Sequence, residues 1–410
     1  MDISPLEKTL EKTGILNNLN CGWIMNWLNH WGQRLAAVAL LFVLVWSVAG
    51  CAWLSSGVTE RIFLDVGLTF LDRFELAPQS FEGTPIGGLS ALTYDRQGNV
   101  FYALSDDRSA PHFYTFAISL TSEESPHLET IEPVGVTGLK TATGEPWPGN
   151  TLDPEGLALS PQGTLWLSSE GVYATEEPPK LLEFNRETGE ELRSLPIPAL
   201  FSPRVDPQTR RQQTGVQSNL GLESLTLTPT GSSAAQEPVR LFSLNESPLV
   251  QDVDLSVAEE GGRLRFLHYY LADGPPLLIA EHLYPLDTVS LAVVSGVSEL
   301  LALDNSGHFL SLERSLTPFG WQAKLFQIAI AGASDISGRS ALQGELRGLT
   351  PIQKQLLVDF SSFDFPVRNW EGMTWGPQLA DGSRSLVLIS DNNFDAEEKN
   401  EFLLFRVNGI

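Results

Sequence analysis

The sequence predicts an all-β fold, a single β-propeller of five four-stranded blades, and three observations support this prediction. Five strand-like segments begin on a small or acidic residue, and each is followed 15 to 23 residues later by an apolar strand that ends on a charged residue. The five segments begin at positions 90, 155, 223, 299 and 371, which gives similar spacings of 65, 68, 76 and 72 residues. The fifth unit reaches a similar length only when residues 61–89 join the C-terminal segment, as happens when a propeller closes.

Gly, Pro, Asp and Ser residues that favour turns divide each unit into strands. In chain order the expected strands are Leu89–Tyr94, Val100–Ser105, His112–Leu120 and Leu128–Val136, then Glu155–Leu159 and Leu165–Glu170, then Glu223–Leu227, Val239–Leu244, Arg263–Leu271 and Leu277–Tyr284, then Leu300–Leu303, Phe309–Leu312, Trp321–Ala329 and Gln355–Phe360, and finally Glu371–Trp375, Leu386–Asp391 and Glu401–Val407. We expect Leu68–Leu76 to form the outer strand of the fifth blade. A six-bladed propeller is the alternative that periodicity leaves open.

The charge balance narrows the possible partners. Acidic residues outnumber basic ones 50 to 26, for a formal net charge of −24. This composition excludes nucleic acid as an expected partner, because phosphate contacts require clustered Lys and Arg. It permits cation binding, although a solvated acidic surface that keeps a secreted protein soluble would have the same composition.

The N-terminal region predicts export. An uninterrupted apolar run from Leu35 to Val48 follows Arg34, and Val48-Ala49-Gly50-Cys51 resembles the lipobox of bacterial lipoproteins. In such proteins a signal peptidase cleaves before the cysteine, which carries a lipid. We therefore expect Cys51 to be lipidated and to tether the protein to the membrane of a bacterial cell envelope, facing the periplasm or the cell surface.

On this interpretation residues 1–50 are the signal segment, 51–60 a tether and 61–410 the propeller. The 34 residues before the apolar run are long for a signal, and a start at Met25 would give a 26-residue signal. An uncleaved anchor helix over Leu35–Leu54 and simple cleaved secretion are the alternatives. No cysteine follows Cys51, so the exported domain has neither a disulfide nor a thiolate nucleophile. We expect it to be a monomer.

The repeat also predicts a site. Because neighbouring strands run antiparallel, the residue that opens the first strand of a blade lies beside the residue that closes the second. Applied to every blade, this gathers one set of carboxylates around one mouth of the central channel: Asp106, Asp107, Glu155, Glu170, Glu223, Glu246, Glu299, Glu313, Glu371 and Asp391. Such a set repels itself unless protons, arginines or a metal neutralise it. Oxygen ligands without cysteine select hard cations, Ca²⁺ first and Mg²⁺ next.

Other chemistries lack their motifs. The sequence contains no Gly-x-Ser-x-Gly elbow, and its histidines lack the spacing of a zinc site. Arg108, Arg314 and Arg368 lie beside the acidic positions and could share in neutralising them. The simpler interpretation of the acidic residues is that they end strands through local turn hydrogen bonds.

Five segments resemble the phytase-like β-propeller family, whose members are often labelled "esterase-like activity of phytase". They are Asn150–Leu157, Asn219–Leu225, Phe309–Arg314, Asn369–Met373 and Leu388–Phe394. The resemblance covers roughly residues 61–410. It implies a propeller that hydrolyses esters or phosphate esters with the help of calcium. The chain departs from the pattern at Ser90, Ser224 and Arg314, so one calcium ion per blade is not expected.

We therefore predict a calcium-dependent hydrolase of small-molecule esters or phosphate esters. The predicted metal ligands are Asp106, Glu155, Glu223, Glu371 and Asp391, and the predicted catalytic residues are Glu170, Glu246 and Arg314. In this scheme Glu170 or Glu246 is a general base or a further ligand, and Arg314 stabilises an anionic transition state. The alternatives are a non-catalytic envelope propeller that binds a ligand or protein, and an enzyme acting on sugars or lactones at one calcium ion.

Overall fold

The computed structural model describes residues 62–172, 177–228, 238–254, 256, 261–271, 274–395 and 397–409. The chain divides into Met1–Ile62 and a compact unit, Phe63–Ile410, and only the second unit is described below. The predicted signal, the lipidation site Cys51 and the tether lie outside the described residues. Within the described part of the chain, no helix has the length and apolar character needed to cross a membrane.

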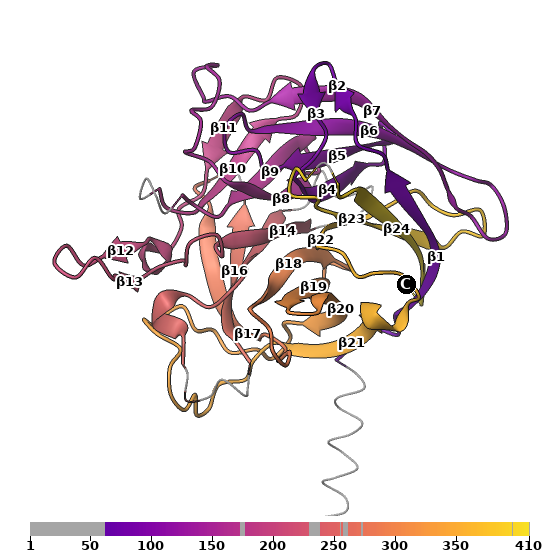
Figure 1. The fold of residues 1–410 in the computed structure, drawn as a ribbon. Coiled ribbons are helices and arrows are strands. Elements are labelled where there is room, and N and C mark those ends of the chain that lie inside the picture. The colour runs from indigo at the N-terminus through magenta and orange to yellow at the C-terminus, as the bar shows by residue number, and fades with distance from the viewer. Residues whose placement is uncertain are drawn as a thin grey trace, which may run out of the picture. The chain divides into compact units, whose positions relative to one another are not determined.

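Five four-stranded antiparallel sheets make up the unit, as the sequence predicts (Figure 1). The first contains β4 (Leu89–Asp95), β5 (Val100–Ser105), β6 (His112–Leu120) and β7 (Leu128–Gly138). The second contains β8 (Pro154–Leu159), β9 (Thr164–Ser169), β10 (Lys180–Asn185) and β11 (Glu191–Ser194). The third contains β14 (Leu222–Thr228), β15 (Val239–Asn245), β16 (Arg263–Leu271) and β17 (Leu277–Pro285). The all-β five-bladed prediction is confirmed.

The last two sheets close the ring. The fourth contains β18 (Val294–Ala302), β19 (His308–Thr317), β20 (Gly320–Ala329) and β21 (Gln353–Asp359). The fifth contains β22 (Trp370–Trp375), β23 (Arg384–Ser390), β24 (Asn400–Asn408) and the N-terminal β1 (Gly67–Leu76). β1 pairs with β24 along its whole length, from Gly67 opposite Asn408 to Leu76 opposite Asn400. The strand expected at Leu68–Leu76 therefore closes the fifth blade, as predicted.

The short elements lie outside these sheets. They are the strand pairs β2 (Ser80–Phe81) with β3 (Thr84–Pro85) and β12 (Arg204–Val205) with β13 (Gln212–Thr214), and the 3₁₀ turns η3 (Ala199–Phe201), η5 (Val250–Asp252) and η7 (Phe360–Ser362). The β12–β13 hairpin projects away from the sheets (Figure 1).

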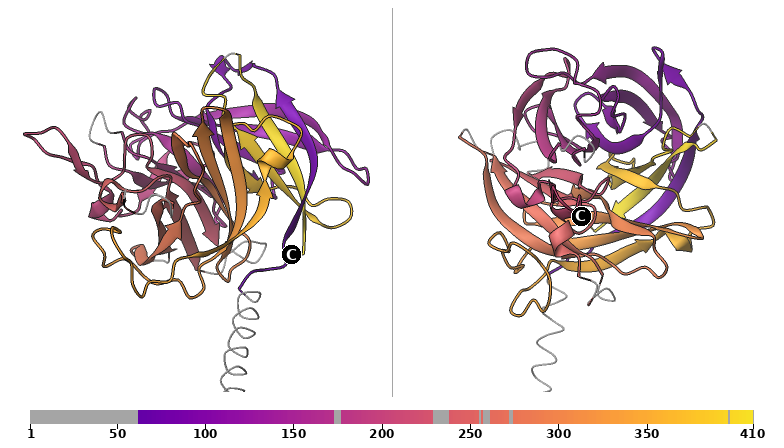
Figure 2. Two further views of the ribbon diagram at one scale, coloured as in Figure 1. Left: turned by 60° about the horizontal axis from the view of Figure 1, so that its bottom comes forward. Right: turned by 60° about the vertical axis from the view of Figure 1, so that its left-hand side comes forward.

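The innermost strands of neighbouring blades pack on each other in a closed circle, β4 on β8, β8 on β14, β14 on β18, β18 on β22 and β22 on β4. Figure 2 shows this arrangement of the sheets around a common axis from two further directions. Five apolar clusters fill the five gaps, and each draws its side chains from two adjacent sheets. The rings of Trp166 and Trp370 are fully buried in two of these clusters. The inner strands are therefore buried between blades rather than facing water.

At the end of the ring where the innermost strands finish, the described turns after β4, β18 and β22 lead into the second strands of their blades. Polar side chains stabilise these turns by accepting hydrogen bonds from backbone amides. Asp95 accepts from Gln97, Asp304 from Ser306 and Asp381 from Ser383, over 2.8 to 2.9 Å. At this end the acidic residues do what the simpler interpretation expects, which is to end strands.

The fourth blade differs from its prediction. Its first strand was expected to begin at Leu300, but β18 begins at Val294 and pairs with β19 as far as Leu316. The extension lengthens the β18–β19 hairpin at the end opposite the Asp304 turn. The added residues include Ser295, Gly296 and Ser298, and the continuous apolar run begins only at Leu300. The sequence pattern therefore predicted a strand shorter than the one observed.

Candidate functional site: the axial mouth

Two sets of five equivalent positions, one position of each set per blade, lie at the end of the ring where the innermost strands begin. We call this end the axial mouth. Each innermost strand has a β-bulge there, which leaves one residue out of the pairing register in four strands and two residues, Glu155 and Gly156, in β8. The residues at these bulges are Ser90, Glu155, Glu223, Ser298 and Glu371. A bulge re-aims its side chain relative to the regular alternation of a strand. The repeat therefore directs one bulge residue from each of the five blades toward the axial mouth.

The second set of five positions lies on the second strand of each blade or directly after its end. Asp106, Glu170, Glu246 and Asp391 each donate a backbone hydrogen bond of 2.7 to 3.1 Å to the segment before the first strand of their blade. Arg314 holds the corresponding position in the fourth blade, where it pairs with Gly296. These five residues were all among the predicted site residues, and the repeat brings them to the same end of the ring.

Two acidic residues assigned to the mouth from sequence lie elsewhere. The bulge residue of the fourth blade is Ser298, so the assignment of Glu299 was wrong by one position, and its carboxylate accepts from the Leu300 and Leu225 amides inside the ring. The assignment of Glu313 to the mouth was also wrong. Its carboxylate faces the outer strands, where Tyr284 and Lys354 donate to it over 2.5 and 2.6 Å.

Hydrogen bonds between adjacent blades run around the mouth. They join Ser90 Oγ to the carbonyl of Pro154, Ser168 Oγ to the carbonyl of Glu223, the Val297 amide to the carbonyl of Glu246, Ser298 Oγ to the carbonyl of Trp370, and the Gly88 amide to Asn392 Oδ1. The two serines that replace acids at the bulges therefore connect blades. This circle of contacts fixes the spacing of the carboxylates before any ligand binds.

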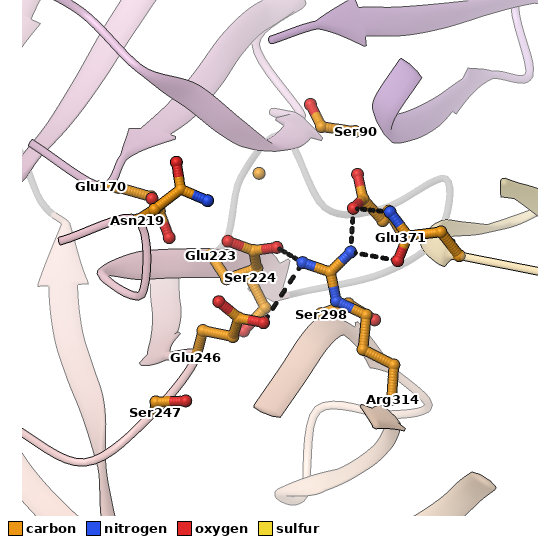
Figure 3. Close-up of polar contacts among 12 residues, drawn as sticks. Ser90, Glu170, Asn219, Glu223, Ser224, Glu246, Ser247, Ser298, Arg314 and Glu371 are labelled. Atoms are coloured by element: carbon orange, nitrogen blue, oxygen red, sulfur yellow. Dashed lines mark hydrogen bonds and ion pairs between the residues drawn. The ribbon is translucent and has the colours of Figure 1, made fainter. Parts of the chain in front are cut away.

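Arg314 occupies one half of the mouth, where it joins carboxylates of two other blades (Figure 3). Its Nη2 donates to Glu223 Oε1 at 2.7 Å and to Glu246 Oε1 at 3.2 Å. Its Nη1 donates to Glu371 and, at 2.7 Å, to Asn369 Oδ1. Burial opposes the charge on this guanidinium, but Glu246 and Glu223 outweigh burial and raise the pKa of Arg314.

The other half of the mouth is built from Asp153, Glu155 and Glu170. Arg108 donates to Asp153 Oδ1 at 2.5 Å and also bonds Asn219. Glu170 Oε1 accepts the Gly221 amide at 2.8 Å. Asp153 Oδ2 and Glu170 Oε2 are buried and have no hydrogen-bond partner. Because an unpartnered buried carboxylate oxygen is costly, this half of the mouth is incomplete as a structural element.

The carboxylates of this region satisfy the spacing of a cation site twice. One oxygen each from Asp153, Glu155 and Glu170 lie within 4.8 Å of one another, and the same is true of Glu170, Glu223 and Glu246. Glu170 belongs to both groups. A set of hard oxygen ligands at this spacing suits Ca²⁺ or Mg²⁺.

Three of the remaining predicted residues, Asp107, Asp391 and Arg368, have local partners. Asp391 Oδ1 accepts the Asn393 amide at 2.8 Å, and Asp107 accepts the Ser109 amide at 2.8 Å, so both also stabilise turns. Asp106 Oδ1 is buried without a partner. Arg368 pairs with Glu401 at 2.8 Å, not with the acids of the mouth.

Burial raises the pKa of the clustered carboxylates. Burial, and then the charge of Glu223, raise the pKa values of Glu155 and Glu170 well above their ordinary value. Burial and Glu246 raise the pKa of Glu223 to about 8, although Arg314 acts in the opposite direction. Burial, with the charges of Asp391 and Asp153, raises the pKa of Asp106 to about 7. Without a bound cation, the mouth therefore holds protons at neutral pH.

These shifts predict how the stability of the metal-free protein depends on pH. A carboxyl group with a raised pKa in the folded state stabilises that state below its ordinary pKa of 4.5, and this contribution is lost as pH rises through about 8. In EDTA we expect the melting temperature of Glu223→Gln, minus that of the unchanged protein, to increase between pH 5 and pH 9. Differential scanning fluorimetry measures this difference. A constant or falling difference would contradict the assigned shift.

Sequence reasoning missed two features of the mouth. Asp153 was overlooked because it precedes the strand, at a position where the first and third blades carry Gly88 and Gly221. The signal was available in Asp153-Pro154-Glu155, where two acids flank one proline. Asn369, which bonds both Arg314 and Glu371, was seen only as part of a motif.

Comparison with protein families decides the relationship. The family described as "Phytase-like: Esterase-like activity of phytase" matches residues 84–394, which is more than half of the chain. The chain belongs to this family. The match spans every residue of the axial mouth named above and supports the resemblance seen in the sequence. A search of curated proteins finds no match.

Solved structures resemble the chain only distantly. An endo-arabinase from Bacteroides thetaiotaomicron VPI-5482 has 10% identity and a TM-score of 0.39, over 81% of this chain and 97% of that one. The catalytic domain of a GH62 α-L-arabinofuranosidase from Coprinopsis cinerea has 10% identity and a TM-score of 0.39, over 84% and 97%. The N-terminal domain of Nup159 has 13% identity and a TM-score of 0.33, over 84% and 96%. These scores are too low to carry an argument about function.

Proposed function

We propose that this member of the phytase-like family is a metal-dependent hydrolase of carboxylic or phosphate esters, with Ca²⁺ as the first candidate cation and the axial mouth as its site. The observation that carries the proposal is the cluster of acidic side chains there. Two groups of three carboxylate oxygens lie within 4.8 Å, and buried oxygens of Asp153 and Glu170 lack partners. Turn formation does not require such a cluster, because the turns at the opposite end use single acids.

The donor set fits a hard divalent cation. Asp153, Glu155 and Glu170 would hold it, and a neutralising charge would satisfy the oxygens left without partners. When bound, such a cation supplies Lewis-acid polarisation of an ester oxygen and a more acidic water. Of the ligands predicted from sequence, Glu155 belongs to this half. Glu223 and Glu371 contact Arg314 instead. Asp106 and Asp391 occupy, in the first and fifth blades, the position that Glu170 occupies in the second.

Three further side chains have roles in this proposal. Arg108 is 38% exposed at the rim and pairs with Asp153, so its remaining N–H groups would orient an anionic part of a substrate. Glu246 is assigned as the general base, because burial raises its pKa and its carboxylate lies near Glu170. Arg314 keeps Glu246 and Glu223 in place and supplies positive charge next to them.

The test is turnover on a panel of esters with the full-length protein. We expect release of phosphate from phytate or p-nitrophenyl phosphate, or release of p-nitrophenol from its carboxylic esters, in millimolar Ca²⁺. EDTA and Glu155→Gln should each abolish it, and added Ca²⁺ should reverse the effect of EDTA. Glu183→Gln is the matched control, since Glu183 pairs with Arg193 in the same blade and contacts no acid of the mouth. A calcium-loaded protein that turns over no member of the panel would contradict the proposal.

A second candidate function is a non-catalytic propeller that binds a ligand or another envelope protein. One observation favours it, which is that Arg314 joins three carboxylates of the mouth, so that part of their charge is already balanced by a side chain. On this view the mouth is partly a structural ion-pair network. Ligand-dependent thermal stabilisation without turnover would support this function.

Export and membrane tethering complete the proposal. They rest on the lipobox-like Val48–Cys51 and the apolar run before it. Mass spectrometry of the mature N-terminus should find a lipid-modified Cys51. An intact segment before Cys51 would point to the anchor-helix alternative, and a start at Met25 in the unprocessed precursor would explain the long leader.

A further inference from the structure

The fivefold repeat makes one substitution in the mouth stand out. Just after the second strand, four blades carry Asp106, Glu170, Glu246 and Asp391, whereas the equivalent position of the fourth blade, which lies within the longer β19, carries Arg314. A basic residue thus replaces an acidic one at a position where the backbone geometry is shared. Its guanidinium is 11% exposed and reaches across to the third and fifth blades.

The contacts of Arg314 coincide with one of the two possible cation sites. The oxygens of Glu170, Glu223 and Glu246 have the spacing of a metal site, but Glu223 and Glu246 accept hydrogen bonds from Arg314 Nη2. A guanidinium lying against two of these three carboxylates provides the positive charge that an ion would otherwise provide. A divalent ion and Arg314 would also repel each other at this separation.

The other cation site has a guanidinium against only one of its three carboxylates, that of Asp153. Arg108 reaches only Oδ1 of Asp153, and the Gly221 amide reaches only Oε1 of Glu170. The second oxygens, Asp153 Oδ2 and Glu170 Oε2, belong to side chains that are 1% and 2% exposed, and neither has a partner. Two nearly inaccessible oxygens without donors, beside a third carboxylate, form an arrangement that a divalent cation would satisfy.

We infer that Arg314 is a built-in cation that takes the place of a second metal ion, so that the axial mouth binds one divalent cation, at Asp153, Glu155 and Glu170. The inference shares with the proposed function the premise that a cation binds here, but it concerns the number and place of ions rather than turnover. One consequence is that chelators remove only part of the positive charge. The half of the mouth around Glu223, Glu246 and Glu371 keeps its counter-charge when calcium is scarce.

The test counts ions on the full-length protein by isothermal titration with Ca²⁺, checked by equilibrium dialysis. We expect one ion per chain in the unchanged protein, two in Arg314→Met, and one in Arg314→Lys, which keeps a positive charge. Asp153→Asn should bind none. Two ions on the unchanged protein, or a single ion on a folded Arg314→Met, would overturn the inference.

Two measurements keep the test decisive. If Arg314→Met does not fold without calcium, the ion count on the unchanged protein still tests the inference. The second measurement is the rise in melting temperature that calcium causes. A larger rise for Arg314→Met than for the unchanged protein supports the inference. Failure of the inference is also distinct from failure of the proposed function. One bound ion with no turnover contradicts only the hydrolase, and turnover with two bound ions contradicts only the single-ion site.

Discussion

Replacing Arg265 by alanine is expected to lower the free energy of unfolding by about 3 to 5 kcal/mol, the cost typical of breaking a buried ion pair. Arg265 on β16 is fully buried and makes a two-bond contact with Asp252, from Nε at 2.6 Å and from Nη2 at 3.0 Å. Its Nη1 donates to Glu281 at 3.1 Å. Alanine would leave two buried carboxylates without their cation. Asp252 also accepts the Leu342 amide, so the loss would extend to the loop packed on the third blade.

Urea denaturation of the full-length protein measures this effect. Arg265→Lys should cause a smaller loss, because lysine keeps the charge but not the two-bond geometry. The control is Arg347→Ala, an exposed partner of Glu345 whose removal should leave the midpoint unchanged. Burial raises the pKa of Glu281 and Arg265 opposes this rise, so the loss in Arg265→Ala should be greater at pH 8 than at pH 5. A loss below about 1 kcal/mol at pH 8 would show that the triad is not a significant stabilising element.

The blade pattern was predictable because each blade repeats one arrangement under one physical constraint. Inner strands pack on two neighbours, so nearly all of their residues are buried, and the turn residues between them recur at similar intervals. The closing strand could be predicted because Leu68–Leu76 alternates and has no partner within its own segment. Gly67–Leu76 indeed pairs with β24.

The details of the mouth were less predictable because β-bulges carry little sequence signal. A one-residue bulge determines whether Ser298 or Glu299 faces the mouth, and an acidic residue at the second position hid the serine at the first. Neighbouring residues of a strand point to opposite faces, so Glu313 faces outward to Lys354 while Arg314 faces the mouth. The partners of a long side chain depend on the neighbouring blades, so the contact of Arg314 with Glu223 and Glu371 follows from the closed ring rather than from spacing.

Glu170→Gln is expected to have the largest effect on cation binding, because Glu170 belongs to both groups of carboxylates. Its Oε1 accepts the Gly221 amide and its Oε2 has no partner, so glutamine keeps nearly the same shape and removes only the charge. We expect Ca²⁺ affinity and any ester hydrolysis to fall by more than the about 10- to 100-fold that is typical of losing a residue behind a metal ligand. Titration calorimetry and the ester panel measure the two effects.

The same substitution should stabilise the protein when no cation is bound. Burial raises the pKa of Glu170, which means that its ionised form is unfavourable in the folded state, and a neutral amide avoids this cost. In EDTA at pH 8 the melting temperature of Glu170→Gln should therefore exceed that of the unchanged protein, and Ca²⁺ should no longer raise it. Glu183→Gln, in the same blade but paired with Arg193, should keep the calcium response. Loss of stability in EDTA together with a normal calcium response would mean that Glu170 is a structural residue and that the cation, if it binds, binds elsewhere.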